Sequence, residues 1–127
     1  MLAHPKTIVI AEAGVNHNGS PDMALRLVDA AADAGADIVK FQLFHADALV
    51  SPDARKADYQ KRTTGPGQTQ LEMLQQLELQ EDDFHRILRR CHERHIGFLA
   101  TPFDEKSLDE LVGKYEAETI KFASGEL

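Results

Sequence analysis

The chain has 127 residues, of which 43% are hydrophobic and 28% are charged, a balance typical of a folded domain rather than a disordered or fibrous protein. Its net charge of −7 argues against a nucleic-acid partner, because a phosphate backbone selects basic surfaces. No apolar run approaches the roughly 20 residues that span a bilayer, and the N-terminus lacks a signal-peptide layout. The single cysteine, Cys91, cannot form a disulfide within the chain. We therefore expect a cytoplasmic protein without a membrane partner.

The first part of the chain predicts a strand, a helix and a second strand. Residues 7–11 (TIVIA) form a short β-branched run that is typical of a strand buried on both faces. Ser20 and Pro21 are typical of an N-cap and a first helical turn, and the helix is expected to end at Gly35. Residues 37–41 (DIVKF) predict the second strand.

The later part continues the same alternation. Its predicted elements are a helix, a strand, a helix and a strand at residues 81–95, 98–101 (FLAT), 104–113 and 119–123 (TIKFA). A β-α-β-α-β-α-β order predicts a parallel sheet with helical crossovers. The long polar stretch 43–70 interrupts this order directly after the second strand, and loops of that length are usually functional or disordered.

Polar side chains occupy the C-terminal end of every predicted strand, although a strand buried on both faces should be apolar. They are Glu12, Lys40, Gln42, Thr101 and Lys121, with Ser124 and Glu126 just beyond the last strand. Because the C-terminal ends of parallel strands lie at one edge of the sheet, we expect these groups to converge. Lysines, amides and hydroxyls are donors that suit a phosphorylated, carboxylated substrate.

A structural ion pair is the alternative for these charges, with Lys40 bonded to Glu12 or Glu126. Two lysines at matching strand ends, with two glutamates nearby, favour an anion-binding site instead.

The loop at residues 14–19 (GVNHNG) has two interpretations that stay open. Turn chemistry alone explains Asn18 and Gly19, whereas a binding loop would use His17 to position an acid or a polar substrate. The histidines at 85, 92 and 95 lie on a predicted surface helix and do not suggest a metal site. No dinucleotide-binding, phosphate-loop or nucleophile-elbow motif occurs in the sequence.

Several blocks of the sequence resemble the sialic acid synthase family, which includes the legionaminic and pseudaminic acid synthases. They are AEAGVNHNG (11–19), AGADIVKFQLF (34–44), YQ (59–60), LEMLQQLEL (71–79), FLATPFD (98–104) and IKFASGEL (120–127). The resemblance implies an α/β fold, the (β/α)8 TIM barrel, with residues 1–127 as its N-terminal half of about four β/α units. The second half and a C-terminal antifreeze-like domain would then lie outside this chain.

The resemblance also implies a reaction. The enzyme would condense phosphoenolpyruvate with the open-chain aldehyde of an N-acyl amino-hexose, either N-acetylmannosamine or 2,4-diacetamido-2,4,6-trideoxymannose. Such a carbon–carbon bond-forming transferase releases a nine-carbon 2-keto sugar acid and inorganic phosphate. A divalent metal, Mn²⁺ or Mg²⁺, would polarise the aldehyde. Its ligands are expected in the second half, so this chain would supply no metal ligand, and the family implies a homodimer.

When the family's residue roles are transferred to the matching motifs of this sequence, the resemblance implies a role for each polar residue. The phosphoenolpyruvate-binding residues would be Lys40, Gln42, Thr101, Lys121 and Ser124. The catalytic residues would be Glu12 and Glu126, in charge stabilisation and proton transfer. The sugar site would include His17, Asn18 and Tyr59. The loop blocks look more like the sialic and legionaminic branch than the pseudaminic branch.

Two other functions remain open at this point. A class I aldolase-like barrel would use Lys40 or Lys121 as a Schiff-base nucleophile. A non-catalytic half-barrel would act as a binding module. We expect the chain alone to be inactive, and to self-associate or depend on a second half, because half a barrel exposes strand edges.

Overall fold

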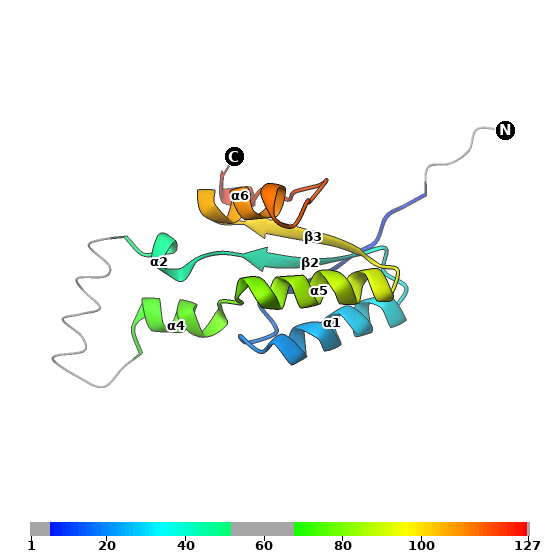
Figure 1. Cartoon of the computed structure of the whole chain (residues 1–127), viewed down its shortest axis with the longest axis horizontal. Coiled ribbons are helices and arrows are strands. Elements are labelled where there is room, and N and C mark those ends of the chain that lie inside the picture. Colours follow the sequence, from blue (N-terminus) through cyan, green and yellow to red (C-terminus); the bar gives the residue numbers. More distant parts are fainter. Residues whose placement is uncertain (1–5, 52–67, 127) are drawn as a thin grey trace.

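A computed structural model describes residues 6–51 and 68–126, apart from the side chain of Glu126 (Figure 1). Its elements are β1 (Ile10–Gly14), α1 (Pro21–Asp33), β2 (Ile38–Leu43), α2 (Ala46–Leu49), α4 (Gln70–Leu77), α5 (Glu81–Glu93), β3 (Gly97–Pro102), α6 (Glu105–Gly113) and a 3₁₀ turn, η1 (Ser124–Glu126). The three strands of this part of the chain form one parallel sheet in the order β1-β2-β3. The predicted α/β class with a parallel sheet is confirmed.

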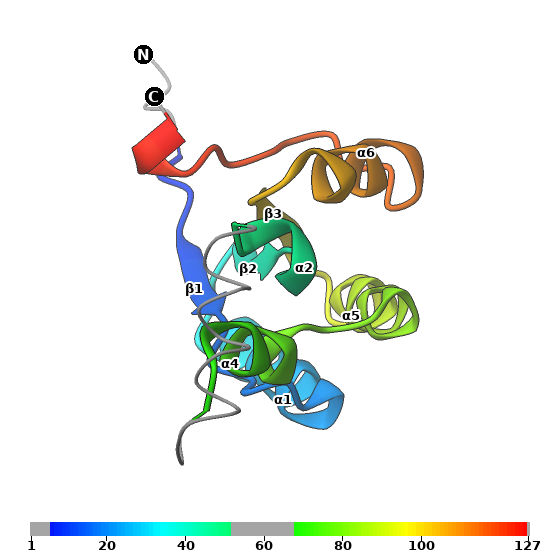
Figure 2. The same cartoon turned by 90° about the vertical axis from the view of Figure 1, so that its left-hand side faces the viewer.

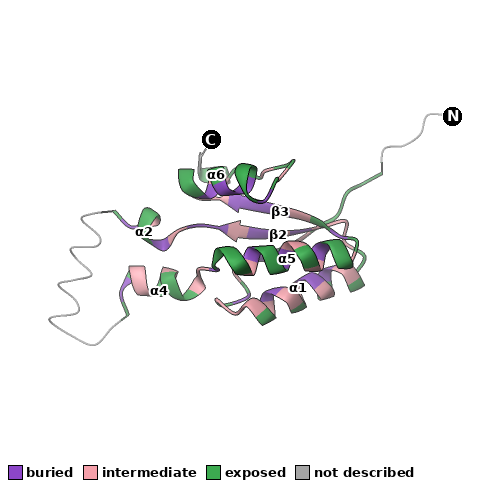
Figure 3. Cartoon of the chain, viewed as in Figure 1, coloured by how far each residue is buried: buried purple, intermediate pink, exposed green. Residues whose placement is uncertain are grey.

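Helices cover one face of the sheet. Figure 2 shows α1, α5 and α6 on the same side of the strands, and Figure 3 shows the buried sides of α1 and α5 turned toward the sheet. The odd-numbered residues of β2 (Val39, Phe41 and Leu43) are buried beneath this layer, where Phe84 and Ile87 of α5 join the same core. Burial of such apolar side chains is the main stabilising contribution to the fold.

The opposite face of the sheet receives the even-numbered residues of β2. Lys40 and Gln42 alternate with the buried core positions and are only partly buried. The sequence expectation that these two side chains share a face is therefore confirmed, because successive strand residues point to opposite faces.

Local sequence signals set the helix boundaries. The Ser20 hydroxyl accepts a hydrogen bond from Met23 N at 3.2 Å, as an N-cap does, and Pro21 opens α1. Gly35 follows the end of that helix with a φ of 78°, a conformation that glycine adopts without strain. Asp104 caps α6 by accepting from Ser107 N at 2.8 Å.

The first strand begins later than its sequence predicts. β1 starts at Ile10 rather than at Thr7, because its partner strand β2 starts at Ile38, which is in register with Ile10. Ile8 and Val9, expected to be buried on both faces, are 61% and 54% exposed. A β-branched run indicates that a segment can form a strand, but the partner strand decides where pairing begins.

The fourth predicted strand, residues 119–123, is wrong for this structure. The segment has no strand geometry, and its backbone is joined to β3 by the hydrogen bond from Lys121 N to Ala100 O at 3.2 Å. A parallel ladder needs repeated bonds of this kind. Phe122, near the end of the segment, is 59% exposed, so burial of its ring contributes little to holding the segment against β3.

The predicted long loop contains helices that the sequence analysis missed. Helix α2 lies directly after β2, and α4 begins at Gln70 with a capping box between Thr69 and Glu72. Residues 52–67 lie outside the described part of the chain.

We predict that Gly19→Ala destabilises the protein more than Gly35→Ala. Both glycines have positive φ, but a Cβ on Gly19 would lie 1.9 Å from the Gln76 carbonyl oxygen, whereas one on Gly35 meets nothing within 4 Å. Gly35→Ala should cost about 1 kcal/mol of unfolding free energy, and Gly19→Ala about 2 kcal/mol more through overpacking. Urea unfolding of the two variants measures the difference, and equal losses would refute the predicted clash.

Candidate functional site

An ion pair joins the middle of β1 to the middle of β2, so Glu12 and Lys40 do not end their strands as the sequence analysis expected. Glu12 and Lys40 are in register, and Lys40 Nζ contacts Glu12 Oε2 directly. The Lys40 side chain is 17% exposed and that of Glu12 is 51% exposed, so the pair is open to solvent on its glutamate side. The pairing that the sequence analysis considered as the alternative is thus present, and it leaves the carboxylate accessible to a ligand.

A bulge at the end of β1 brings Gln42 to the same place. The register of β1 with β2 shifts between Glu12 and Gly14, and Gly14 has a φ of 54°. A Cβ on Gly14 would lie 3.1 Å from Glu12 Oε1 and 3.7 Å from Gln42 Nε2. The carboxylate and the amide therefore approach the same glycine, which leaves room for both.

Thr101 completes this group from β3. It is in register with Gln42 and is 4% exposed. We call Glu12, Lys40, Gln42 and Thr101 the strand-end group. An ammonium, an amide and a hydroxyl beside a carboxylate can donate hydrogen bonds to an anion while the carboxylate faces a developing positive charge.

The side chains of Lys121 and Ser124 do not join the strand-end group. Lys121 is exposed and its ammonium donates to the Phe122 carbonyl oxygen. Ser124 is exposed on η1, and the backbone of Glu126 belongs to the same turn. Within the described residues, no hydrogen bond or ion pair joins Lys121 or Ser124 to the strand-end group. Tyr59 lies outside the described residues.

His17 lies on the helix-covered side of the sheet. It is 1% exposed, its ring stacks on Phe41 at 6.3 Å, and its Nδ1 accepts a hydrogen bond from Gly19 N at 3.0 Å. Asn18 is exposed, with a φ of 50° and a turn bond from its N to Val15 O at 3.0 Å. These contacts give His17 and Asn18 a structural role in the loop. Their role at a sugar site stays a prediction.

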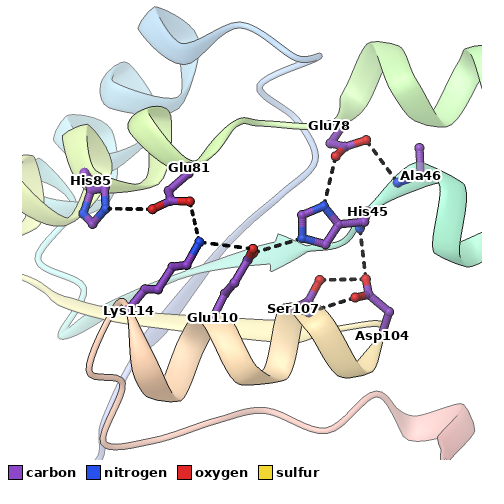
Figure 4. Close-up of polar contacts among 9 residues, drawn as sticks. All are labelled: His45, Ala46, Glu78, Glu81, His85, Asp104, Ser107, Glu110 and Lys114. Atoms are coloured by element: carbon purple, nitrogen blue, oxygen red, sulfur yellow. Dashed lines mark hydrogen bonds and ion pairs between the residues drawn. The ribbon is translucent and has the colours of Figure 1, made fainter.

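A second polar cluster, missed by the sequence analysis, surrounds His45 (Figure 4). His45 Nε2 lies 2.9 Å from Glu110 Oε2, and its Nδ1 lies 3.3 Å from Glu78 Oε1. The backbone is bonded as well, since His45 N donates to Asp104 Oδ2 at 2.9 Å and Ala46 N donates to Glu78 Oε2 at 3.0 Å. The bonded partners lie 32 to 65 residues apart in sequence, so no local sequence motif predicts the cluster.

A cavity of about 450 Å³ adjoins this cluster, and His45, Glu78, Glu110 and Tyr115 are among the residues that line it. The Tyr115 hydroxyl is buried and has no hydrogen-bond partner within the described residues. Its burial, with the nearby carboxylates of Glu110 and Glu81, raises the pKa of Tyr115 to about 12. The phenol is therefore neutral at physiological pH.

The described residues offer no metal site. Within 6–51 and 68–126, no group of three or more His, Cys, Asp or Glu side chains is placed to hold a metal ion. The same part of the chain contains no helix with the length and apolar character needed to cross a bilayer.

Comparison with known proteins gives consistent matches. The model of the NeuB family matches residues 27–127. The chain is 45% identical to an N,N'-diacetyllegionaminic acid synthase of Campylobacter jejuni over 96% of the chain and 36% of that protein. It is 46% identical to the enzyme of the same name from Legionella pneumophila over 94% of the chain and 33% of that protein. The chain thus spans about a third of the length of these curated relatives.

A solved structure agrees with these matches. The N-acetylneuraminic acid synthetase of Leptospira borgpetersenii superposes with a TM-score of 0.71 at 30% identity, over 99% of this chain and 41% of that one.

We predict that His17 makes the protein less stable as the pH falls. Burial lowers the pKa of His17 below its ordinary value, with the Asp83 carboxylate opposing the shift, so the folded chain resists a proton that the unfolded chain binds. The associated stability is full above the unfolded value of about 6.5 and is lost as the pH drops below it. Urea unfolding at neutral and mildly acidic pH should show a smaller loss in His17→Asn, whose side chain can still accept from Gly19 N. The exposed control His92→Gln should behave as the wild type. An unchanged loss in His17→Asn would contradict the assignment.

Proposed function

The chain belongs to the NeuB family, and from that premise we propose that its parent protein condenses phosphoenolpyruvate with an N-acyl amino-hexose. The products are a nine-carbon 2-keto sugar acid and inorganic phosphate, so the enzyme is a carbon–carbon bond-forming transferase. Relatives named as legionaminic and sialic acid synthases support this reaction class.

The observation that carries the proposal is the strand-end group. Lys40, Gln42 and Thr101 are donors on the sheet face that the helices leave uncovered. Gln42 and Thr101 lie near the C-terminal ends of parallel strands, where ligands of α/β enzymes bind, and Lys40 lies two residues before Gln42 on the same face. Lys40 supplies the positive charge that a phosphate and a carboxylate require, and its contact with Glu12 keeps the ammonium on this face of the sheet.

In the proposed reaction the enol carbon of phosphoenolpyruvate attacks the aldehyde carbon of the sugar and forms the new carbon–carbon bond. The positive charge that develops on the phosphate-bearing carbon is stabilised by the Glu12 carboxylate, which is accessible beside Gly14. Water adds to that carbon, the bond from the carbon to the phosphate oxygen breaks, and inorganic phosphate leaves as the ketone forms. Lys40, Gln42 and Thr101 hold the phosphate and carboxylate throughout.

The remaining parts of the site are proposed from the family. The sheet would extend into a (β/α)8 barrel, in which residues 119–123 pair further with β3 and bring Lys121, Ser124 and Glu126 to the strand-end group. The bond from Lys121 N to Ala100 O, next to Thr101, supports this placement. Tyr59 would line the sugar site. The homodimer, the antifreeze-like domain and the cytoplasmic location belong to the same proposal.

The divalent metal implied by the family does not fit the described residues of this chain. No group of three or more metal-ligating side chains lies within 6–51 and 68–126. The family resemblance implies that its ligands lie in the second half of the barrel, so we derive no step through the metal, and we expect the chain alone to be inactive.

The proposed sugar is 2,4-diacetamido-2,4,6-trideoxymannose. The relatives that are 45% and 46% identical to the chain are both named as N,N'-diacetyllegionaminic acid synthases, which supports this choice over N-acetylmannosamine.

Phosphate release by the full-length protein tests the proposed function. The protein, supplied with Mn²⁺ and phosphoenolpyruvate, is offered each of the two sugars in parallel. We expect release that depends on the diacetamido sugar. Absence of release with either sugar, from folded and metal-loaded protein, would contradict the proposal, and borohydride trapping of a lysine adduct would favour the aldolase alternative.

We predict that Lys40→Gln lowers kcat/KM for phosphoenolpyruvate by about 10² to 10³, as the loss of a charge-stabilising donor does. The matched control is Lys6→Gln, because Lys6 is also paired with a carboxylate, that of Asp37, but its side chain is 81% exposed. Steady-state kinetics of both variants measure the effect. A Lys40 variant that keeps wild-type kcat/KM would remove the strand-end group from the mechanism.

A further inference from the structure

The His45 side chain lies between two carboxylates that come from different parts of the fold. Glu78 follows α4, and Glu110 lies on α6. The side chains are mostly buried, with 23% of His45, 18% of Glu78 and 10% of Glu110 exposed. We call these three residues the His45 bridge (Figure 4).

The bridge uses both ring nitrogens of His45. Nε2 lies 2.9 Å from Glu110 Oε2, and Nδ1 lies 3.3 Å from Glu78 Oε1. The imidazole therefore links two carboxylates from different parts of the fold to the segment that follows β2.

The bridge lies directly beyond the strand-end group. Gln42 and Thr101 are in register, and two hydrogen bonds continue the link between the strands after them. Phe103 N donates to Leu43 O at 3.1 Å, and His45 N donates to Asp104 Oδ2 at 2.9 Å. The His45 bridge therefore fixes the segment that directly follows β2.

We propose that His45 is a positioning residue for the binding of phosphoenolpyruvate. Its side chain holds the segment that follows β2 against Glu78 and Glu110 and thereby fixes Gln42 and Lys40. This inference rests on the proposed function. His45 acts through β2 and does not touch the substrate.

Several other charges surround the His45 bridge. On the α6 side His45 faces the carboxylates of Asp104 and Glu110, with Lys114 3.6 Å from the far oxygen of Glu110. The remaining charged residues that line the adjoining cavity are Asp47 on α2, Glu81 at the start of α5 and Lys106 on α6.

Steady-state kinetics of the full-length protein test the proposal through three variants. His45→Gln should raise KM for phosphoenolpyruvate about tenfold while kcat stays nearly constant. Glu110→Gln should keep KM near the wild-type value, because its amide can still hydrogen-bond to the imidazole of His45. The control His92→Gln should follow the wild type.

Amide hydrogen exchange without substrate gives an independent readout. Protection of the amides in residues 43–50 should be lower in His45→Gln than in the wild type and unchanged in His92→Gln. Turnover by the wild type combined with a His45→Gln variant that keeps the wild-type KM and the wild-type protection would overturn the role of His45. Expected exchange behaviour without any turnover would instead refute the proposed function and leave the bridge standing.

Discussion

The alternation of β2 between two environments is the constraint on which the rest of the structure depends. Val39, Phe41 and Leu43 must be buried against the helices, since they form the centre of the apolar core. A strand that places its odd-numbered residues in the core has to place Lys40 and Gln42 on the other face. The position of the strand-end group is thus a consequence of how the core is packed.

The same constraint explains which parts of the sequence analysis held. The shared face of Lys40 and Gln42 depends on strand alternation, and the N-cap at Ser20 depends on a hydrogen bond within three residues. Such local rules can be read from sequence. The α/β class followed from them, because alternating strands and helices leave few other arrangements.

The parts that failed depend on partners far away in the chain. Where β1 begins is decided by β2, and residues 119–123 need more than one ladder bond to β3 to become a strand. The His45 bridge joins residues separated by more than 30 positions, and its carboxylates look like ordinary surface charges in the sequence. Long-range pairing of this kind leaves no periodic signal.

The two charge clusters have different roles in the proposed function. The Lys40–Glu12 pair lies on the uncovered face, where a ligand can reach it, whereas the His45 bridge lies among the helices and is largely buried. A charge that is buried has to be paired, so both clusters are held in place by their partners. The proposed function uses the first cluster to bind an anion and the second to fix the strand that carries it.

A crystal structure of the full-length protein with bound phosphoenolpyruvate would show whether the strand-end group binds this substrate. We predict that Lys40 Nζ lies about 2.8 Å from a phosphate or carboxylate oxygen of the ligand, with Gln42 and Thr101 also in contact. Phosphoenolpyruvate bound elsewhere, with Lys40 still bonded to Glu12 alone, would contradict it.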